Sequence, residues 1–407
     1  MKNRIFIFLL VLLASDILFS FDASGQNKNQ KDIKTGADSP ELYLPKLKDK
    51  RVGVLVNPTS RTHGKHLVDF LIDNNINVAL IFAPEHGFRG EHGAGEVVKN
   101  NRDPSTGIEI ISLHGKIKKP LKEHIDQLDI LLFDIKDVGV RYYTYISSMH
   151  YFMESCADNQ IPIVILDRPN PNGDYIAGPV LDLEYQSFVG MHPIPVVHGL
   201  TVAELANMIQ GEGWLNSNKS CKTHIVANQN YDHGMSYSLP VKPSPNLPND
   251  RSVRLYPSLG FFEATPVSVG RGTNLPFQVL GYSNRKMGNF SFKPTKIRGS
   301  WKDLNHAGTM LFGENLSYST ENGQKYNKMD LSLFIKWYQI FKKNELNMIN
   351  RPKFLAKLSG SKQLEAWVGA GKSAEQIENL WRSDLLKYQK IRKKYLLYKD
   401  SDYLTNF

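Results

Sequence analysis

The chain has few cysteines and lacks a glycine-rich nucleotide fingerprint, and both absences narrow its possible functions. Only two of its 407 residues are cysteines, which is too few for a disulfide framework. The first apolar run, residues 52–56, is followed by no G-x-G-x-x-G motif, so no dinucleotide cofactor is indicated. The stretch "GAGKS" at 369–373 has alanine at the first glycine position of a P-loop, and we expect no nucleotide cofactor there.

Long apolar runs are absent after the first residues of the chain. The start, "MKNRIFIFLLVLLASDILFSFDASGQ", has Lys2 and Arg4 before an apolar stretch that Asp16 interrupts, and Ala23 and Gly25 are spaced as a cleavage site. This pattern predicts a secretory signal over residues 1–25 and an exported, periplasmic or envelope-associated protein. The alternative is an uncleaved membrane anchor. No later transmembrane segment is expected.

Charge and cysteine usage are both interpreted in the light of export. The formal net charge of +10 favours an anionic envelope polymer or a lipid surface over nucleic acid, and no nucleic-acid module is recognisable. No obligate protein partner is indicated. Export permits a disulfide between Cys156 and Cys221. Cys156 lies in a helical pattern, however, and this favours its interpretation as a small buried hydrophobe.

Short apolar runs alternate with helical patterns in the first part of the chain. The runs are rich in Val, Ile and Leu and show little alternation, which is typical of strands buried on both faces of a parallel sheet. They span residues 52–56, 78–82, 108–113, 129–135 and 161–167. Helical patterns cover 65–75 and 143–159. The sequence therefore predicts an α/β fold with a Rossmann-like, doubly wound, mostly parallel sheet.

The proline-rich stretch "LPVKPSPNLPND" suggests a domain boundary near residue 250. The predicted organisation is a signal peptide (1–25), a polar tether (26–43), a Rossmann-like catalytic domain (44–250) and a smaller α+β domain (251–407). Residues 256–282 look like β-structure and turn, and the tail from Leu331 looks helical. Two capping boxes predict helix starts, at Thr201 with Glu204 and at Ser373 with Gln376.

Acidic side chains gather in the loops that follow the predicted strands. In open parallel sheets the ligand site lies beyond the carboxyl ends of the strands, so these loops are expected to meet. The Gly-rich loop "APEHGFRGEHGAGE" supplies three of them, Glu85, Glu91 and Glu96, and three more end the neighbouring strands, Asp134, Asp137 and Asp167. Hydrolysis of an acetal needs one protonated carboxylic acid and one ionised carboxylate. The alternative is that these acids cap helices or pair with arginines.

Two further groups of side chains suggest binding. The motif "VGVRYYTY" places Arg141, Tyr142 and Tyr143 at a strand-to-helix junction, and "DRPNPNG" adds Arg168, Asn170 and Asn172. Tyrosine rings with amide and guanidinium donors suit a polyhydroxylated sugar, and an arginine fork matches a carboxylate. Paired histidines such as His63 and His66 lack the pattern of a metal site, and loop histidines bonded to carboxylates or backbone are the favoured interpretation.

Six motifs occur in the order of a known family. They are "APEHGFRGEHGAGE", "DVGVRYYTYISSM", "DRPNPNG", "HGLTVAELA", "PSPNLP" and "SVGRGTNLPFQ". Together they resemble the bacterial exo-β-N-acetylmuramidases, glycoside hydrolase family 171, long known as a domain of unknown function. The resemblance runs from about residue 46 to residue 398. It implies a Rossmann-like domain joined to a smaller domain, with the active site in the cleft between them, and release of N-acetylmuramic acid from the non-reducing end of peptidoglycan fragments.

The resemblance also suggests roles for individual residues. Glu85 is the expected general acid, tuned by His86 or Arg89. Asp134 or Glu96 is expected either to orient the 2-acetamido group of the substrate as an internal nucleophile or to act as nucleophile or base. Arg141 or Arg271 is expected to bind the lactyl carboxylate. The full set of expected substrate-binding residues is Arg89, Arg141, Tyr142, Tyr143, Asp167, Arg168, Asn170, Asn172, Glu263 and Arg271.

Two other functions remain open at this point. One is a non-catalytic envelope protein that binds glycan, although clustered carboxylates near an anionic ligand argue against it. The other is a metal-dependent amidase or esterase acting on the same polymer. The favoured reading is a glycosidase that uses carboxylates and requires neither a metal nor an organic cofactor.

Overall fold

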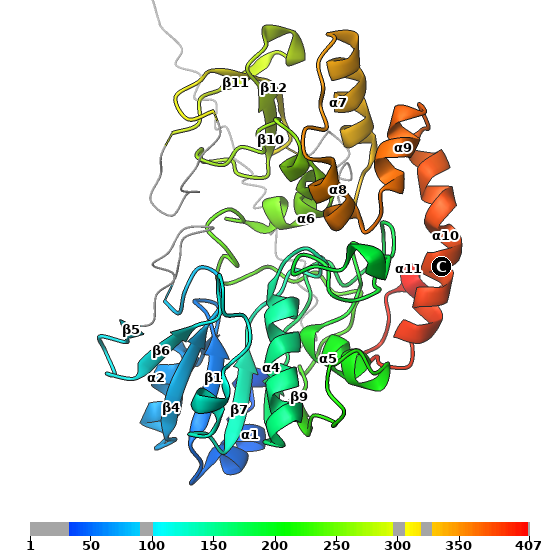
Figure 1. Ribbon diagram of the computed structural model, residues 1–407. Coiled ribbons are helices and arrows are strands. Elements are labelled where there is room, and N and C mark those ends of the chain that lie inside the picture. Colours follow the sequence, from blue (N-terminus) through cyan, green and yellow to red (C-terminus); the bar gives the residue numbers. More distant parts are fainter. Residues whose placement is uncertain (1–31, 90–100, 296–305, 319–327, 406–407) are drawn as a thin grey trace, which may run out of the picture. The chain divides into compact units, whose positions relative to one another are not determined.

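A seven-stranded sheet organises the first half of the chain in the computed structural model, which describes residues 32–89, 101–295, 306–318 and 328–405. The strand order is β5-β6-β4-β1-β7-β8-β9 (Figure 1). Every pair of neighbouring strands is parallel except β5 with β6, at the edge of the sheet. The predicted doubly wound, mostly parallel sheet is therefore confirmed.

All five predicted strands are present within two residues of their expected ends. They are β1 (Val52–Val56), β4 (Val78–Ala83), β6 (Glu109–Ser112), β7 (Ile130–Asp134) and β8 (Ile163–Leu166). The sequence pattern did not indicate the two outermost strands, β5 (Asn101–Arg102) and β9 (Thr223–Val226). β5 has only two residues, both exposed, and most of β9 is only partly buried, so neither strand has the continuous apolar run of the central strands.

Helices cover both faces of this sheet, as Val54 and Leu55 on β1 illustrate. Val54 packs in a core with helices α1 (Pro40–Leu47) and α2 (Leu67–Asp73). Leu55 points to the other face, whose core includes residues of α3 (Lys122–Ile125), α4 (Tyr145–Asn159) and α5 (Val202–Gly211). Successive residues of a strand face opposite sides, and this gives the central strands their buried pattern on both faces.

A second, smaller α+β domain lies in the later part of the chain. Its three-stranded sheet is antiparallel, in the order β10-β12-β11. The strands are β10 (Val279–Tyr282), β11 (Phe290–Phe292) and β12 (Leu311–Asn315). The helices are α6 (Asp250–Leu259), α7 (Ser332–Lys343), α8 (Pro352–Ser359), α9 (Gln363–Gly369), α10 (Ala374–Arg392) and α11 (Asp402–Thr405). Both predicted capping boxes are confirmed, at the starts of α5 and α10.

Short elements complete the described fold. They are β2 (Arg61–Thr62) and β3 (Lys65–His66), which form a hairpin, and the 3-10 helices η1 (Gly36–Asp38), η2 (Leu183–Tyr185), η3 (Gly260–Ala264) and η4 (Arg285–Met287). Within the described ranges, no helix combines the length and apolar character needed to cross a membrane.

Three sequence-based expectations are wrong in this structure. Residues 256–264 were expected to be β-structure and turn, but they are helical and belong to α6 and η3. Pro257, which normally interrupts a helix, lies inside α6. The expected tether does not extend to residue 43, since η1 and the start of α1 lie within it and Ala37 and Tyr43 are fully buried. Cys156 is joined to Cys221 by a disulfide, because the last turns of α4 pack beside the segment that enters β9.

Several contacts join the first domain to the later part of the chain, and two of them involve residues that the sequence suggested for the site. The buried Arg141 guanidinium donates to the carbonyls of Pro179, Ile194 and Leu358, so it links the first domain to α8. Residues 388–404, here called the C-terminal strap, return to the first domain. The Tyr398 hydroxyl donates to the Asp167 carboxylate at 2.6 Å, and the strap thereby covers the end of β8.

Candidate active site

Glu85 lies in a tight turn directly after β4. The amide of Gly87 donates to the carbonyl of Pro84 at 3.1 Å, which closes a β-turn with Glu85 and His86 at its centre. His86 has a φ of 72°, in the left-handed region that glycine normally occupies at this turn position. Such a backbone is sparsely populated by other residues and tends to occur at functional sites. Glu85 is partly exposed beside the buried His86.

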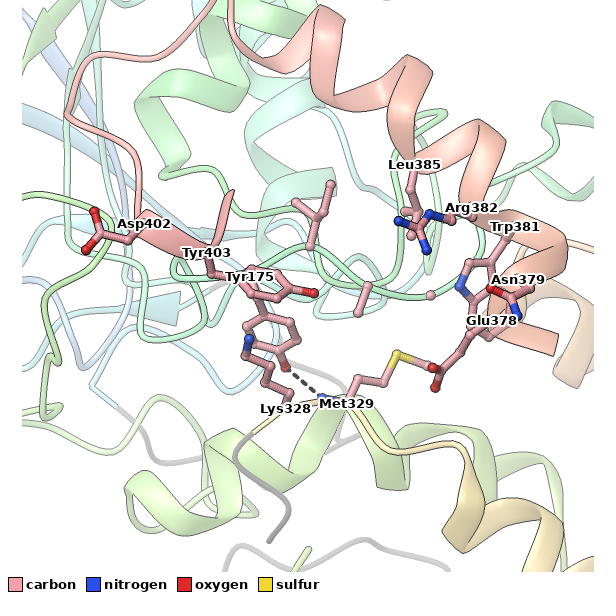
Figure 2. A pocket seen from close by; sticks show the side chains of 13 residues that line it. Tyr175, Lys328, Met329, Glu378, Asn379, Trp381, Arg382, Leu385, Asp402 and Tyr403 are labelled. Atoms are coloured by element: carbon pink, nitrogen blue, oxygen red, sulfur yellow. Dashed lines mark hydrogen bonds between the residues drawn. The ribbon is translucent and has the colours of Figure 1, made fainter. Parts of the chain in front are cut away.

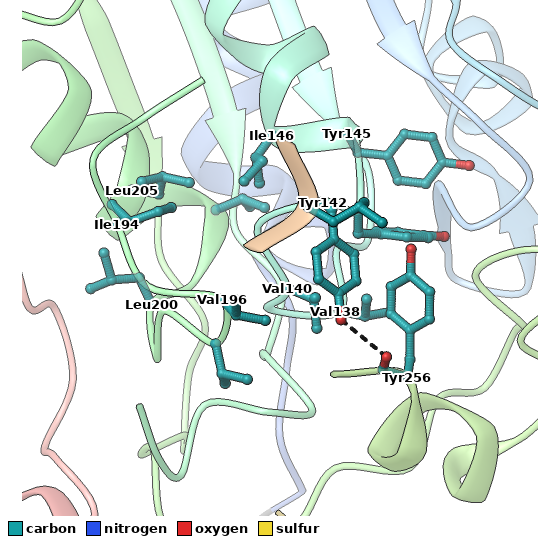
Figure 3. Packing of buried hydrophobic residues seen from close by; sticks show 14 of the residues in the cluster. Val138, Val140, Tyr142, Tyr145, Ile146, Ile194, Val196, Leu200, Leu205 and Tyr256 are labelled. Atoms are coloured by element: carbon teal, nitrogen blue, oxygen red, sulfur yellow. Dashed lines mark hydrogen bonds between the residues drawn. The ribbon is translucent and has the colours of Figure 1, made fainter. Parts of the chain in front are cut away.

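A cluster of tyrosine rings packs beside this turn, at the start of α4. The Tyr145 hydroxyl donates to the Glu85 carbonyl at 3.4 Å. The rings of Tyr143 and Tyr145 are 4.9 Å apart, and Tyr256 of α6 lies 5.9 Å from Tyr143 and 5.3 Å from Tyr142. Figure 3 shows the rings of Tyr142, Tyr145 and Tyr256 together in the core. Burial raises the pKa of Tyr145, and the Glu85 carboxylate raises it further.

Tyr142 also fixes the second domain against this cluster. Its hydroxyl donates to the carbonyls of Pro257, at 2.8 Å, and Tyr256, at 3.2 Å. A Cβ added to Gly260 would lie 2.5 Å from the Tyr142 ring, so only glycine permits this approach. Residues three apart are eclipsed in a 3-10 helix. Glu263, three residues after Gly260 in η3, is therefore directed to the same side as Tyr142.

Glu263 forms an ion pair with Arg271, and both side chains are about one-fifth exposed, at 22% and 18%. The Arg271 guanidinium also lies 5.0 Å from the centre of the Phe277 ring, a cation–π contact. Burial raises the pKa of Tyr256, the carboxylates of Glu263 and Glu85 raise it further, and Arg271 lowers it. Glu85 and Glu263 therefore both act on Tyr256, although they belong to different domains.

Tyr256 belongs to the tyrosine cluster but was not among the site residues predicted from the sequence. The capping box at Asn249 and Ser252 is visible in the sequence and would have predicted the helix that carries this tyrosine. Pro257, the next residue, concealed that signal because proline normally interrupts a helix.

Several residues that the sequence suggested for the site lie in structural ion pairs. Asp134 is fully buried and receives two hydrogen bonds from Arg168, at 2.5 and 2.7 Å. Arg89 makes four hydrogen bonds to the carboxylates of Asp69 and Asp103, which hold the pKa of Arg89 high. These contacts anchor the strand-end loops to the domain. The binding and catalytic roles predicted for Asp134, Arg168 and Arg89 stay predictions.

Other predicted residues brace the loops around the site. Arg141 is fully buried on backbone carbonyls, and burial lowers its pKa to about 9. Asn170 and Asn172 donate to the carbonyls of Leu200 and Val138, respectively, each at 2.8 Å. Asp167 accepts hydrogen bonds from the Ala203 amide, Asn228 and Tyr398, while burial raises its pKa to about 7. Glu91 and Glu96 lie outside the described residues.

Asp137 is a buried carboxyl group close to the tyrosine cluster. Its Oδ1 atom accepts from the Gly139 amide at 2.7 Å, whereas Oδ2 has no hydrogen-bond partner in the described part of the chain. Burial raises the pKa of Asp137 to about 7. Its side chain is only 6% exposed, so it lies beneath the site rather than on its surface.

A cavity of about 780 Å³ opens elsewhere, among residues 175–178, α10 and α11 (Figure 2). Its floor includes Tyr175 and Trp381, its rim carries Lys328, Glu378 and Arg382, and none of the predicted site residues lines it. The size of this cavity does not identify it as the active site, because neither Glu85 nor Glu263 lines it. Across the described ranges, no three His, Cys, Asp or Glu side chains are grouped to hold a metal ion.

The fold and the site together define a doubly wound α/β protein whose strand-end loop and second domain bring carboxylates, an arginine and tyrosines together. This arrangement can protonate a leaving group, stabilise positive charge and bind a carboxylate.

The comparisons with known proteins identify the family. A model described as "Exo-beta-N-acetylmuramidase NamZ, N-terminal" matches residues 52–251, and its C-terminal counterpart matches residues 254–398. The chain belongs to this NamZ family. It is 35% identical to the peptidoglycan beta-N-acetylmuramidase NamZ of Bacillus subtilis (strain 168), over 98% of this chain and 100% of that protein.

Solved structures agree with this assignment. A crystal structure of a DUF1343 family protein from Bacteroides fragilis NCTC 9343 is 42% identical and superposes with a TM-score of 0.83, over 91% of this chain and 100% of that chain. A second DUF1343 family protein from the same organism is 28% identical with a TM-score of 0.74, over 90% of this chain and 99% of that chain.

Proposed function

We infer that this protein is an exo-acting glycoside hydrolase that releases N-acetylmuramic acid from the non-reducing end of peptidoglycan fragments. The observation that carries this inference is that, in a chain of the NamZ family, the tyrosine cluster is bonded to the Glu85 turn on one side and packed against η3, which carries Glu263, on the other. Glycosidases commonly use two carboxyl groups around the scissile bond, and the carboxylates here come from two domains.

Glu85 is the general acid of the proposed reaction. It is partly exposed, and the Tyr145 hydroxyl and the turn at His86 hold its backbone at the end of β4. Its carboxyl group gives a proton to the glycosidic oxygen as the bond to the anomeric carbon breaks, so the leaving sugar departs as a neutral alcohol. A water molecule supplies the new hydroxyl at the anomeric carbon, and the proton that this water loses is taken up by a carboxylate of the site.

Arg271 is the group that recognises muramic acid. The lactyl carboxylate distinguishes muramic acid from glucosamine, and a guanidinium fork can bind it through two hydrogen bonds. Arg271 is partly exposed next to Tyr256, whereas Arg141 is buried on three carbonyls and Arg168 is buried on Asp134. We therefore propose that selection for muramic acid depends on the "SVGRGT" turn, which carries Arg271.

We also propose that the chain is exported to the periplasm or cell envelope, where its substrate occurs. The signal-like first 25 residues support this, and so does the Cys156–Cys221 disulfide, which persists in oxidising compartments. Mass spectrometry of the mature protein from the native cell should find Gln26 at the amino terminus. A mature protein that retains residue 2 would contradict the cleaved signal.

The activity is tested with purified protein and two substrates, the 4-nitrophenyl β-glycoside of N-acetylmuramic acid and the disaccharide of N-acetylmuramic acid β-linked to N-acetylglucosamine. Release of free N-acetylmuramic acid from both is expected. Glu85→Gln should lower the rate on the disaccharide by about 100-fold or more, in the range lost with a general acid.

The matched control is Glu123→Gln, because Glu123 on α3 has a 73% exposed side chain. Its rate should equal that of the wild type. Saturable binding of the disaccharide without any product would point to a glycan-binding protein instead, and full activity of Glu85→Gln would exclude Glu85 as the acid.

A further inference from the structure

Glu263 and Arg271 form a partly exposed ion pair that borders the tyrosine cluster. Glu263 is on η3 and Arg271 is in a turn between Gly270 and Gly272, whose φ angles are 82° and 79°. Both glycines adopt the left-handed backbone, so this turn presents Arg271 from a position that other residues would strain. About one-fifth of each side chain of the pair is exposed, so a ligand can reach it from solvent.

The neighbouring acids in the described part of the chain are closed to a substrate. The side chain of Asp134 is 0% exposed and bound by Arg168, and Asp167 is also 0% exposed, with three donors around its carboxylate. Asp137 is 6% exposed beneath the tyrosines. Glu85, whose carbonyl accepts from Tyr145, and Glu263, on the 3-10 helix that packs against Tyr142, are by contrast partly exposed carboxylates beside the tyrosine cluster.

We propose that Glu263 is the second catalytic carboxylate, which faces the anomeric carbon opposite Glu85, and that the lactyl carboxylate of the substrate takes over Arg271 from it. This proposal rests on the proposed function. The transition state of glycoside hydrolysis resembles an oxocarbenium ion, and a carboxylate released from its cation stabilises that positive charge. Binding of muramic acid would therefore itself activate the site.

The surroundings of Arg271 suit such an exchange. The cation–π contact with Phe277 holds the guanidinium in place independently of Glu263, so one carboxylate can replace another without moving the turn. Glu263 is held separately, because η3 is fixed against Tyr142 by the close approach at Gly260. A substrate without the lactyl group leaves Glu263 bound to Arg271, and this accounts for selectivity in the chemical step as well as in binding.

The test compares Glu263→Gln with Glu85→Gln and wild type on the two substrates named above. A nitrophenolate leaves without protonation, so Glu85→Gln should retain much more activity on the chromogenic glycoside than on the disaccharide. Glu263→Gln should lose about 100-fold or more in kcat on both, the size typical of a lost electrostatic contact in the transition state. Its KM should stay equal or fall, because Glu263 no longer competes for Arg271.

The matched control is Glu212→Gln, since Glu212 has a similar exposure of 23% and a similar ion pair, with Lys394, on another face of the protein. Its kcat should remain that of the wild type. Glu263→Ala with added sodium formate provides a second measurement. Recovery of rate with formate shows that the variant is folded and lacks only a carboxylate.

The outcomes separate this proposal from the proposed function. An active wild type with kcat of Glu263→Gln within threefold on both substrates would overturn the role of Glu263 alone. A higher KM with unchanged kcat would also overturn it, because Glu263 would then only bind substrate. A wild type that releases no N-acetylmuramic acid from either substrate would reject the proposed function and this inference with it.

Discussion

The Cys156–Cys221 disulfide provides a prediction whose size follows from the structure. The bridge closes a loop with a sequence separation of 65 residues. In the chain-entropy model, restricting a loop of that length in the unfolded state stabilises the fold by about 4 kcal/mol. This is a large part of the roughly 5–15 kcal/mol by which folded proteins are stable. For a chain of this size it corresponds to about 5 °C in Tm.

Comparison of oxidised with reduced wild-type protein isolates this effect, because both forms keep the same side chains. Thermal unfolding followed by circular dichroism should give the lower Tm for the reduced protein, with mass spectrometry to confirm each redox state. Activity before unfolding should be equal in both forms. Cys156 is eleven residues along α4 from Tyr145, or about 16 Å at the rise of an α-helix, so the bridge is remote from the site.

The double variant Cys156→Ala, Cys221→Ala is the control, and alanine is chosen because both positions are buried. Reductant should leave its Tm unchanged. Equal Tm values for oxidised and reduced wild type would refute the entropic argument, and a response to reductant in the double variant would show that the wild-type effect has another origin.

Two more predictions concern the groups that support the site. Tyr142→Phe removes the hydroxyl that binds the Tyr256 and Pro257 carbonyls. The free energy of unfolding measured in urea should therefore fall by about 1–3 kcal/mol, and kcat should fall because η3 is held less firmly. Unchanged stability and kcat would contradict this. Burial raises the pKa of Asp137 to about 7, well above that of an exposed aspartate, so the folded state binds the proton more tightly and stability should fall as pH rises from about 4 to about 7. Asp137→Asn, which can still accept from the Gly139 amide, should flatten that decline in Tm, and an identical pH profile would show that another group causes it.

The central strands were predictable because each is buried on both faces, which leaves a continuous apolar run in the sequence. β1 matches its predicted range of 52–56, and β4 extends one residue beyond its own. β9 was missed because Thr223 and His224 are only partly buried at the edge of the sheet and carry no such signal. Burial thus determines both the successes and the failures of prediction.

The candidate site was harder to predict, since the exposure of charged side chains and their pairing are not visible in a sequence. The loop that carries Glu85 was recognisable from its glycines and acids at a strand end. Nothing in the sequence distinguished Asp134, which is sealed by Arg168, from Glu263, which remains partly exposed. The pairing of an acid with a particular arginine depends on contacts between distant segments, and only the folded chain reveals them.

The C-terminal strap has a consequence for how the protein is made. Asp167 and the Tyr398 hydroxyl that binds it are separated by 231 residues, and the Glu204 carboxylate accepts from the amide of Leu397. During synthesis, Asp167 and Glu204 therefore lack these partners until residues 397 and 398 have been added to the chain. The first domain cannot mature in order of synthesis, and a fragment that stops near residue 250 should fold poorly when it is expressed alone.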